Sequence, residues 1–125
     1  MAERTRIEEF ERNGRKFIYV DYSDLRKNEH FIELVAEVEK VVEKYPPQSL
    51  YTITNVDKIR FDTTTRELFA EHMAHNKPYV LYGAVIGFDG VIRIMCNTLC
   101  ALTGRNNLIF AYTKEQAIEL LLHRK

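Results

Sequence analysis

Two histidines in one predicted helix have the most suggestive spacing for chemistry. His72 and His75 lie three positions apart in TTTRELFAEHMAHN, whose pattern predicts a helix. Residues with this spacing share a helix face and often bind a metal together. A site needs three or four ligands, however, and no further His or Cys has a supporting spacing. By helical angle His72 falls between Leu68 and Phe69, on the apolar side. We therefore predict no metal or cofactor, and a half-buried, hydrogen-bonded His72.

The two cysteines lie four positions apart in a second predicted helix. A redox pair usually has Cys-x-x-Cys spacing at a helix start, and Cβ geometry is poor for a bridge between Cys96 and Cys100. Cys96 belongs to an apolar face. Its other members are Val91, Ile92, Met95, Leu99 and Leu102. Packing is the predicted role of both cysteines. With only scattered titratable groups, no catalytic residue is predicted and the protein is not expected to be an enzyme.

A run of three threonines, Thr63, Thr64 and Thr65, opens the helix that carries the histidines. One hypothesis is phosphorylation, because the helix N-terminus favours added negative charge and that charge would repel an acidic partner. The alternative is capping, since Thr64 and Glu67 have capping-box spacing.

The turn Gly87–Phe88–Asp89–Gly90 joins a strand to a helix, which is where phosphates bind in nucleotide folds. The sequence is not GxGxxG or a P-loop, and Asp89 is the predicted N-cap, so its carboxylate would repel a phosphate. A tight strand-to-helix turn is the prediction here.

These residues must be positioned by alternating strands and helices. The segment 79–87 is apolar on both alternating faces, which predicts a strand covered on both sides. It leads into a helix that ends at Gly104. Around it we predict strands over 6–11, 15–22, 49–56 and 107–112, and helices over 28–45, 63–76 and 113–123. Asn13–Gly14 predicts a hairpin turn, and Asn28 and Thr113 are predicted N-caps.

This order predicts one α/β domain over residues 1–125, with a mixed, mainly parallel sheet of five strands and four helices. The chain has 18 basic and 18 acidic side chains, so its net charge is zero, which argues against nucleic-acid binding and against a polybasic membrane anchor. No apolar run is long enough for a membrane span, and the first ten residues lack the apolar core of a signal peptide. We expect a cytoplasmic protein.

The order ββαβαβαβα over this length resembles the STAS domain (sulfate transporter and anti-sigma factor antagonist). The phrases YVDYSDL, SLYTITNV, HNKPYVLYGAVIG and NLIFAYTKEQAIELL are similar to an uncharacterised bacterial branch of STAS-like proteins, sometimes grouped as STAS/SEC14-like. In anti-sigma factor antagonists a phosphorylatable Ser or Thr follows the middle strand, in an Asp-x-Ser-Gly-like turn. Asp57 matches the acidic residue of that turn, whereas Lys58 and Ile59 follow it here.

The resemblance implies a non-enzymatic, regulatory protein-interaction module. Its expected surface is the carboxyl edge of the parallel strands, where the predicted loops converge. These loops carry Asp57, Lys58, Gly87, Asp89, Tyr112 and Thr113. Ile94 and Ala101 lie off the main apolar face of their helix, so we expect a second apolar surface there and a homodimer.

The alternative, which the SEC14-like label suggests, is a carrier or sensor of a small apolar or lipid-like ligand. Seven tyrosines are spread over the chain and would suit an aromatic-lined pocket, because tyrosine has an apolar body and a polar tip. A pocket without a polar floor would favour the carrier. A packed core with an exposed apolar patch would favour the interaction module.

Overall fold

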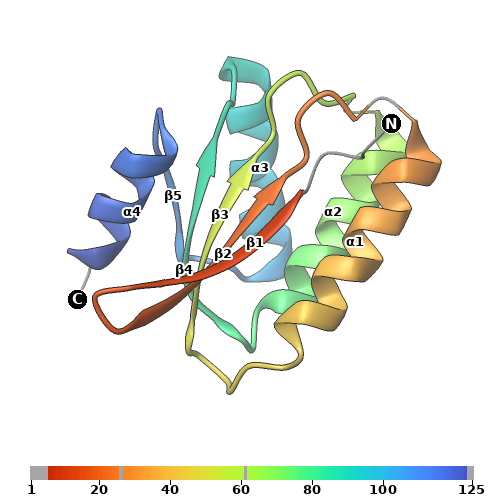
Figure 1. Cartoon of the computed structure of the whole chain (residues 1–125). Helices are drawn as coiled ribbons and strands as arrows, with labels where there is room; N and C mark the ends of the chain where they lie inside the picture. Colours follow the sequence, from red (N-terminus) through yellow and green to blue (C-terminus); the bar gives the residue numbers. More distant parts are fainter. Residues whose placement is uncertain (1–5, 26, 61, 124–125) are drawn as a thin grey trace, which may run out of the picture.

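The computed structural model describes residues 6–25, 27–60 and 62–123 and confirms the predicted α/β class. Its five strands are β1 (Ile7–Arg12), β2 (Arg15–Asp21), β3 (Leu50–Asn55), β4 (Val80–Ile86) and β5 (Leu108–Phe110). Its four helices are α1 (Asn28–Val42), α2 (Thr63–Asn76), α3 (Gly90–Thr103) and α4 (Lys114–Leu122). Figure 1 shows the elements in the predicted order ββαβαβαβα.

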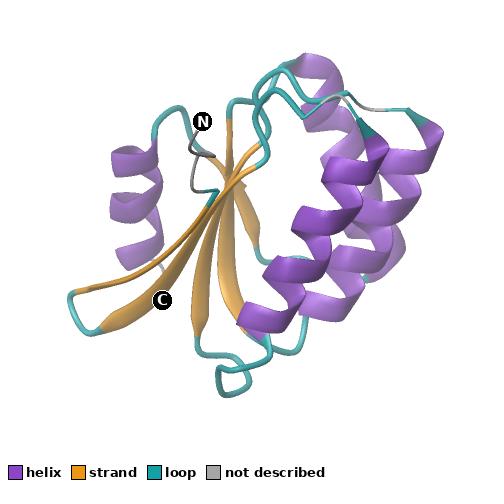
Figure 2. Ribbon diagram, turned by 45° about the vertical axis from the view of Figure 1, so that its right-hand side comes forward, coloured by secondary structure: helices purple, strands orange, loops and turns teal. Residues whose placement is uncertain are grey.

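The strands lie in the sheet in the same order as in the chain, with β1 antiparallel to β2 and all other neighbours parallel. Because each crossover from β2 to β5 moves the same way across the sheet, right-handed connections put α1, α2 and α3 on one face. The fourth helix follows the last strand and packs back on β3 and β4 from the other face. Figure 2 shows this three-layer arrangement.

The opening hairpin forms where Asn13–Gly14 predicts it. Both turn residues have positive φ, 52° and 77°, as a two-residue hairpin turn requires. Its register pairs Arg12 with Arg15 and Ile7 with Val20, so β1 shields one edge of the parallel strands.

The sheet is buried on both faces, as the two-sided apolar pattern of 79–87 predicts. Val85 of β4 joins the core under α1, α2 and α3, whereas Ala84 and Ile86 join the smaller core under α4. Gly83 is the exception in β4, because it presents no side chain to the three-helix layer, and this gap is important for the site.

Helices α1 and α2 begin at the predicted positions, 28 and 63, but their predicted N-terminal capping residues are wrong. Asn28 already has helical backbone at the start of α1, so the N-cap position falls on Lys27, which forms no side-chain cap. In α2 the N-cap is Asp62 rather than Thr64. The Asp62 carboxylate accepts from Thr65 N at 3.0 Å, and the Thr65 hydroxyl accepts from Asp62 N at 2.8 Å. An aspartate before the threonine run completes the capping box and leaves Thr64 exposed.

The predicted packing face of α3 is rotated relative to the structure. Ile92 and Leu99 are buried and Cys96 is partly buried, but Val91 and Leu102 are 67% and 75% exposed rather than in the core. The last strand is also shorter than predicted, because β5 covers only the three residues Leu108–Phe110 of the predicted 107–112. Within the described ranges, no helix is long and apolar enough to cross a bilayer.

Candidate functional site

A cavity of about 60 Å³ lies between the sheet and the three-helix layer. Its apolar walls include Ile18, Val20, Val38, Phe69, Met73 and Leu99. Its polar lining comes from Tyr22, Thr52, Thr54, His72, Asn76 and Arg105. The sheet, α1, α2 and the segment after α3 therefore all contribute to one site.

Small residues on the two central strands leave this space. Thr52 and Thr54 of β3 face the helices where the other strands present larger apolar side chains. Beside them, a Cβ at Gly83 would lie 2.7 Å from both the Thr52 Oγ1 and the Leu108 Cδ2 atoms. A side chain at that position would force Leu108 and Thr52 to shift, so glycine leaves open space between Val80 and Val85 of β4.

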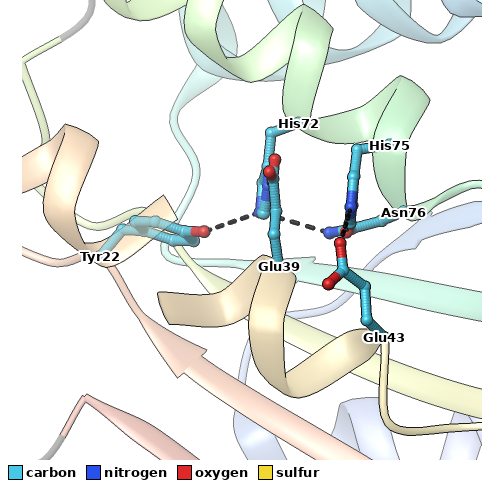
Figure 3. Close-up of polar contacts among 6 residues, drawn as sticks. All are labelled: Tyr22, Glu39, Glu43, His72, His75 and Asn76. Carbon is cyan, nitrogen blue, oxygen red and sulfur yellow. Dashed lines mark hydrogen bonds and ion pairs between the residues drawn. The ribbon is translucent and has the colours of Figure 1, made fainter. Parts of the chain in front are cut away.

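One wall of the cavity is a hydrogen-bonded network centred on His72 (Figure 3). The His72 Nδ1 atom lies 2.9 Å from the Glu39 carboxylate, and its Nε2 atom lies 2.9 Å from the Tyr22 hydroxyl. The Asn76 Nδ2 atom lies 3.3 Å from the same Nε2. The predicted hydrogen-bonded histidine is thus present, and it is 6% exposed rather than half-buried.

A single neutral tautomer of His72 satisfies all these contacts. Its Nδ1–H donates to the Glu39 carboxylate, which can only accept, so Nε2 is left as the acceptor for the Tyr22 O–H and the Asn76 N–H. Burial lowers the pKa of His72 and favours this neutral form, although the hydrogen bond to Glu39 acts the other way. The hydrogen bond from His72 in turn lowers the pKa of Glu39.

His75 forms the matching half of the network at the more exposed end of α2 (Figure 3). Its Nε2 atom lies 2.7 Å from the Glu43 carboxylate and its Nδ1 atom 2.9 Å from the Asn76 Oδ1 atom. Both partners accept, so the protonated ring, which donates from both nitrogens, fits best. Partial burial opposes the charge, but the hydrogen bonds to Asn76 and Glu43 raise the pKa of His75 overall.

Arg105 lines the cavity from the segment between α3 and β5. It is 7% exposed, its Nε donates to the Asn107 Oδ1 atom at 3.1 Å, and Asn107 is anchored to the Val80 and Leu81 carbonyls at 3.0 Å each. The Arg105 Nη2 atom is buried and has no hydrogen-bond partner among the described residues. It lies 3.6 Å from the position of a Cβ on Gly83, next to Thr52.

The Tyr22 hydroxyl and the His72 Nε2 atom lie as close as a proton-transfer pair, but each is occupied by its hydrogen bond to the other. Burial, and then the negative charge of Glu39, raise the pKa of the Tyr22 hydroxyl far above its ordinary value. The hydroxyl therefore stays protonated and acts as a hydrogen-bond donor. What this wall can do is hold a polar group in a fixed place.

The loops predicted to converge at the carboxyl edge do meet there. Gly87 has φ +74°, and a Cβ on it would lie 2.8 Å from the backbone N of Asp57. The Asp57 carbonyl accepts from Asp24 N at 2.9 Å, which brings in the loop after β2. Lys58, with φ 55°, is exposed on the same loop.

The other predicted surface residues lie at the end of the sheet near β5. The rings of Phe88 and Tyr112 are tilted by 33° with centroids 6.1 Å apart, and Tyr112 is 79% exposed. Asp89 and Thr113 are both N-caps: their side chains accept from Ile92 N at 2.8 Å and from Gln116 N at 3.0 Å. The Asp89 and Thr113 side chains are therefore engaged in stabilising helices. Tyr112 is more available than either of them to contact a partner.

The predicted second apolar surface of α3 is larger than Ile94 and Ala101 alone. Both are exposed, Ile94 by 68%, and the displaced Val91 and Leu102 extend the surface along the whole helix. Thr98 lies among them, and its hydroxyl donates to the Ile94 carbonyl at 3.0 Å. We call Val91, Ile94, Thr98, Ala101 and Leu102 the α3 stripe.

The remaining candidates differ in accessibility. Thr63 and Thr64 are exposed, whereas Thr65 is 2% exposed and its hydroxyl belongs to the capping box with Asp62.

Cys96 and Cys100 are partly buried. Burial, and then the charge of Cys100, raise the pKa of the Cys96 thiol to about 11, so little thiolate forms near neutrality. No group of His, Cys, Asp and Glu in the described part of the chain could hold a metal ion.

Sequence reasoning identified His72 but not its partners. Glu39 lies in α1 and Tyr22 directly follows β2, whereas Asn76 lies one turn beyond His72 in α2. Arg105 follows a helix-ending glycine, where an exposed loop residue is usual. Comparison with models of known protein families finds no match for this chain, and comparison with curated proteins finds none either.

Proposed function

We propose that the protein is a non-enzymatic, STAS-like regulatory module that works by protein–protein contact, with the α3 stripe as its main partner surface. The element order supports the family proposal, because it matches ββαβαβαβα from end to end. The observation that carries the functional proposal is the exposure of three large apolar side chains on one helix: Val91, Ile94 and Leu102 at 67%, 68% and 75%.

The stripe has the composition of an interface. Its members are uncharged, and the Thr98 hydroxyl is already satisfied inside the helix, so burying it costs little desolvation. The single charged side chain of α3, Arg93, is directed away and lies over the Phe110 ring at 4.9 Å. Burial of the stripe would therefore leave no polar group unpaired.

The partner that fits best is a second copy of this chain. Val91, Ile94, Thr98 and Ala101 follow the 3-4-3 spacing by which helices pack side by side. Two such stripes related by a two-fold axis are self-complementary, and their lack of charge means that they do not repel. A stable dimer buries roughly 800 Å² per partner, so the contact must extend beyond one helix, and exposed Tyr112 lies at the Val91 end.

Light scattering on the purified chain tests this proposal. We expect the mass of a dimer for the wild type and of a monomer for Ile94→Glu, because a charge in the centre of the stripe would have to be buried. Ile32→Glu is the matched control, since Ile32 is a 48% exposed isoleucine on α1. A monomeric wild type, or equal effects of both substitutions, contradicts the proposal.

Phosphorylation would regulate the contact through Thr63 or Thr64, which are exposed at the carboxyl edge beside Asp62. In the proposed dimer both copies would carry the added negative charge, so phosphorylation should weaken their association. Thr65 is not part of this proposal, because it is 2% exposed and its hydroxyl belongs to the capping box. The dissociation constant of the dimer in Thr63→Glu and Thr64→Glu measures the effect, and unchanged values in both remove the regulatory role.

The alternative function, a carrier of an apolar or lipid-like ligand, has less support. Cavities that enclose drug-sized ligands are roughly 300–1,000 Å³, and this one is about 60 Å³. Its polar lining also differs from the apolar floor that a lipid tail needs. A lipid would enter only if the helices moved away from the sheet.

A further inference from the structure

The guanidinium of Arg105 is a buried positive charge without a counter-ion in the described part of the chain. Its residue is 7% exposed, it forms no ion pair with a described residue, and its Nη2 atom has no hydrogen-bond partner there. Buried charges in proteins are normally paired, because an unpaired one loses its hydration without compensation. An arginine does not escape this cost by losing its proton.

The cavity places other ligand-binding groups near that charge. Thr52 and Thr54 line it, and neither hydroxyl hydrogen-bonds another described residue, so both are free to donate. Another part of the lining is the network of Tyr22, His72 and Asn76, whose polar atoms already hydrogen-bond one another. The remaining walls are apolar. The cavity therefore combines one cationic end, two spare hydroxyl groups and a hydrocarbon surface.

From this geometry we infer that the cavity binds a small monocarboxylate, whose carboxylate lies beside Arg105 and the threonine hydroxyls and whose short hydrocarbon part packs on the apolar walls. Guanidinium and carboxylate match in charge and planar shape. A water molecule could accept a hydrogen bond from Nη2 but would leave the charge unpaired.

Size and charge narrow the ligand class. A single water needs roughly 10–15 Å³ of such cavity space, so about 60 Å³ accommodates a ligand of about four to six non-hydrogen atoms, such as acetate or propionate, and not a fatty acid. A single guanidinium matches one negative charge. A phosphate dianion would bring a second charge toward Glu39, behind His72, and has no apolar part for the walls. This inference does not depend on the proposed dimer, because the cavity lies within one chain.

Isothermal calorimetry and amide NMR on the whole chain test the inference with propionate, and with propionamide, inorganic phosphate and hexanoate as comparison ligands. We expect saturable binding of propionate, with shifts at the amides of Thr52, Gly83 and Arg105. Propionamide has the same shape without the charge, and hexanoate is too long, so both should bind at least about tenfold more weakly. Phosphate should not bind in the cavity.

Arg105→Met keeps the length of the side chain and removes the charge, and we expect it to abolish propionate binding. Arg66→Met, an exposed arginine of α2, is the control and should bind as the wild type does. Should Arg105→Met not fold, nuclear Overhauser contacts between the propionate methyl group and the apolar lining decide the question in the wild type. Absence of propionate binding, equal binding of propionamide, or preferential binding of phosphate would each overturn the inference.

Discussion

His72 and His75 lie one turn apart on α2, yet the structure shifts their pKa values in opposite directions. Asn76 is what links them: its Nδ2 donates to the His72 Nε2 atom, and its Oδ1 accepts from the His75 Nδ1–H group. The Asn76 side-chain amide has one orientation that satisfies both contacts, with its N–H toward His72 and its oxygen toward His75. The neutral state of the His72 ring therefore supports the charged state of the His75 ring. Glu39 and Glu43, also one turn apart on α1, complete the pairs.

The two histidines should titrate separately. NMR titration of the ring protons should give His75 a pKa above the ordinary value of about 6.5 and His72 a pKa below it. The ring ¹⁵N shifts at neutral pH should identify the Nδ1–H tautomer of His72. Coincident titration of the two rings would show that the network does not hold them in different states.

Tyr22 and His72 should be energetically coupled. His72→Leu leaves the buried Tyr22 hydroxyl without its acceptor and should cost roughly 1–3 kcal/mol, whereas Tyr22→Phe should cost about 1 kcal/mol. In the double variant both polar groups are gone, so its cost should be clearly less than the sum. Urea unfolding at neutral pH measures the cycle, with exposed His30→Leu as the control. Additive costs would mean that the contact contributes nothing of its own.

The pH dependence of unfolding should have a component on each side of neutrality. The pKa of His75 is raised in the folded state, so its stabilisation is complete below the unfolded value of about 6.5 and is lost as the pH rises through the folded value. His75→Gln should remove this loss on the alkaline side. Denaturant midpoints of both proteins across the pH range provide the comparison, and identical profiles would contradict the assignment.

On the acid side the signs are reversed. The folded pKa values of His72 and Glu39 are lowered, so their stabilisation is present above the unfolded values and is lost as the pH falls toward the folded ones. The loss should begin below the ordinary histidine value, and the Glu39 contribution should follow below the ordinary carboxyl value. A variant with His72→Leu and Tyr22→Phe should lack the earlier step. It should also weaken the later one, because the hydrogen bond from His72 is the main cause of the lowered Glu39 pKa.

Local signals in the chain were sufficient to predict the framework. Asn13–Gly14 located the hairpin turn, Asp89 and Gly104 located both ends of α3, and Thr113 located the start of α4. Each of these depends on a residue and its immediate neighbours, which is why pattern and turn chemistry predict them.

The site depends on contacts that local signals do not contain. Glu39 meets His72 only because α1 and α2 pack with a particular register, 33 positions apart in the chain. The rotation of α3 was ambiguous for a related reason: apolar residues cover most of its circumference, so the pattern could not decide that Ile92 and Leu99 face the core while Val91 and Leu102 face outward. Burial of Arg105 is set by Asn107 and the β4 carbonyls, which again is a tertiary effect.

Two glycines with the same backbone conformation allow the cost of a close approach to be separated from the cost of positive φ. Gly14 has φ +77° with nothing within 4 Å of an added Cβ, whereas Gly87 has φ +74° with Asn55 Oδ1 at 2.5 Å and Asp57 N at 2.8 Å. Gly14→Ala should therefore show only the conformational penalty, about 1–2 kcal/mol.

Gly87→Ala should show that penalty and a steric one of roughly 1–3 kcal/mol, since the backbone N of Asp57 cannot move aside without breaking its 3.0 Å hydrogen bond to the Asn55 side chain. Urea unfolding of both variants measures the difference. Because Gly87 joins the loops of the carboxyl edge, NMR shifts in Gly87→Ala should spread to Asp57 and Asp24, whereas those in Gly14→Ala should stay within the hairpin. Equal costs for the two variants would mean that these loops are not packed against each other in solution.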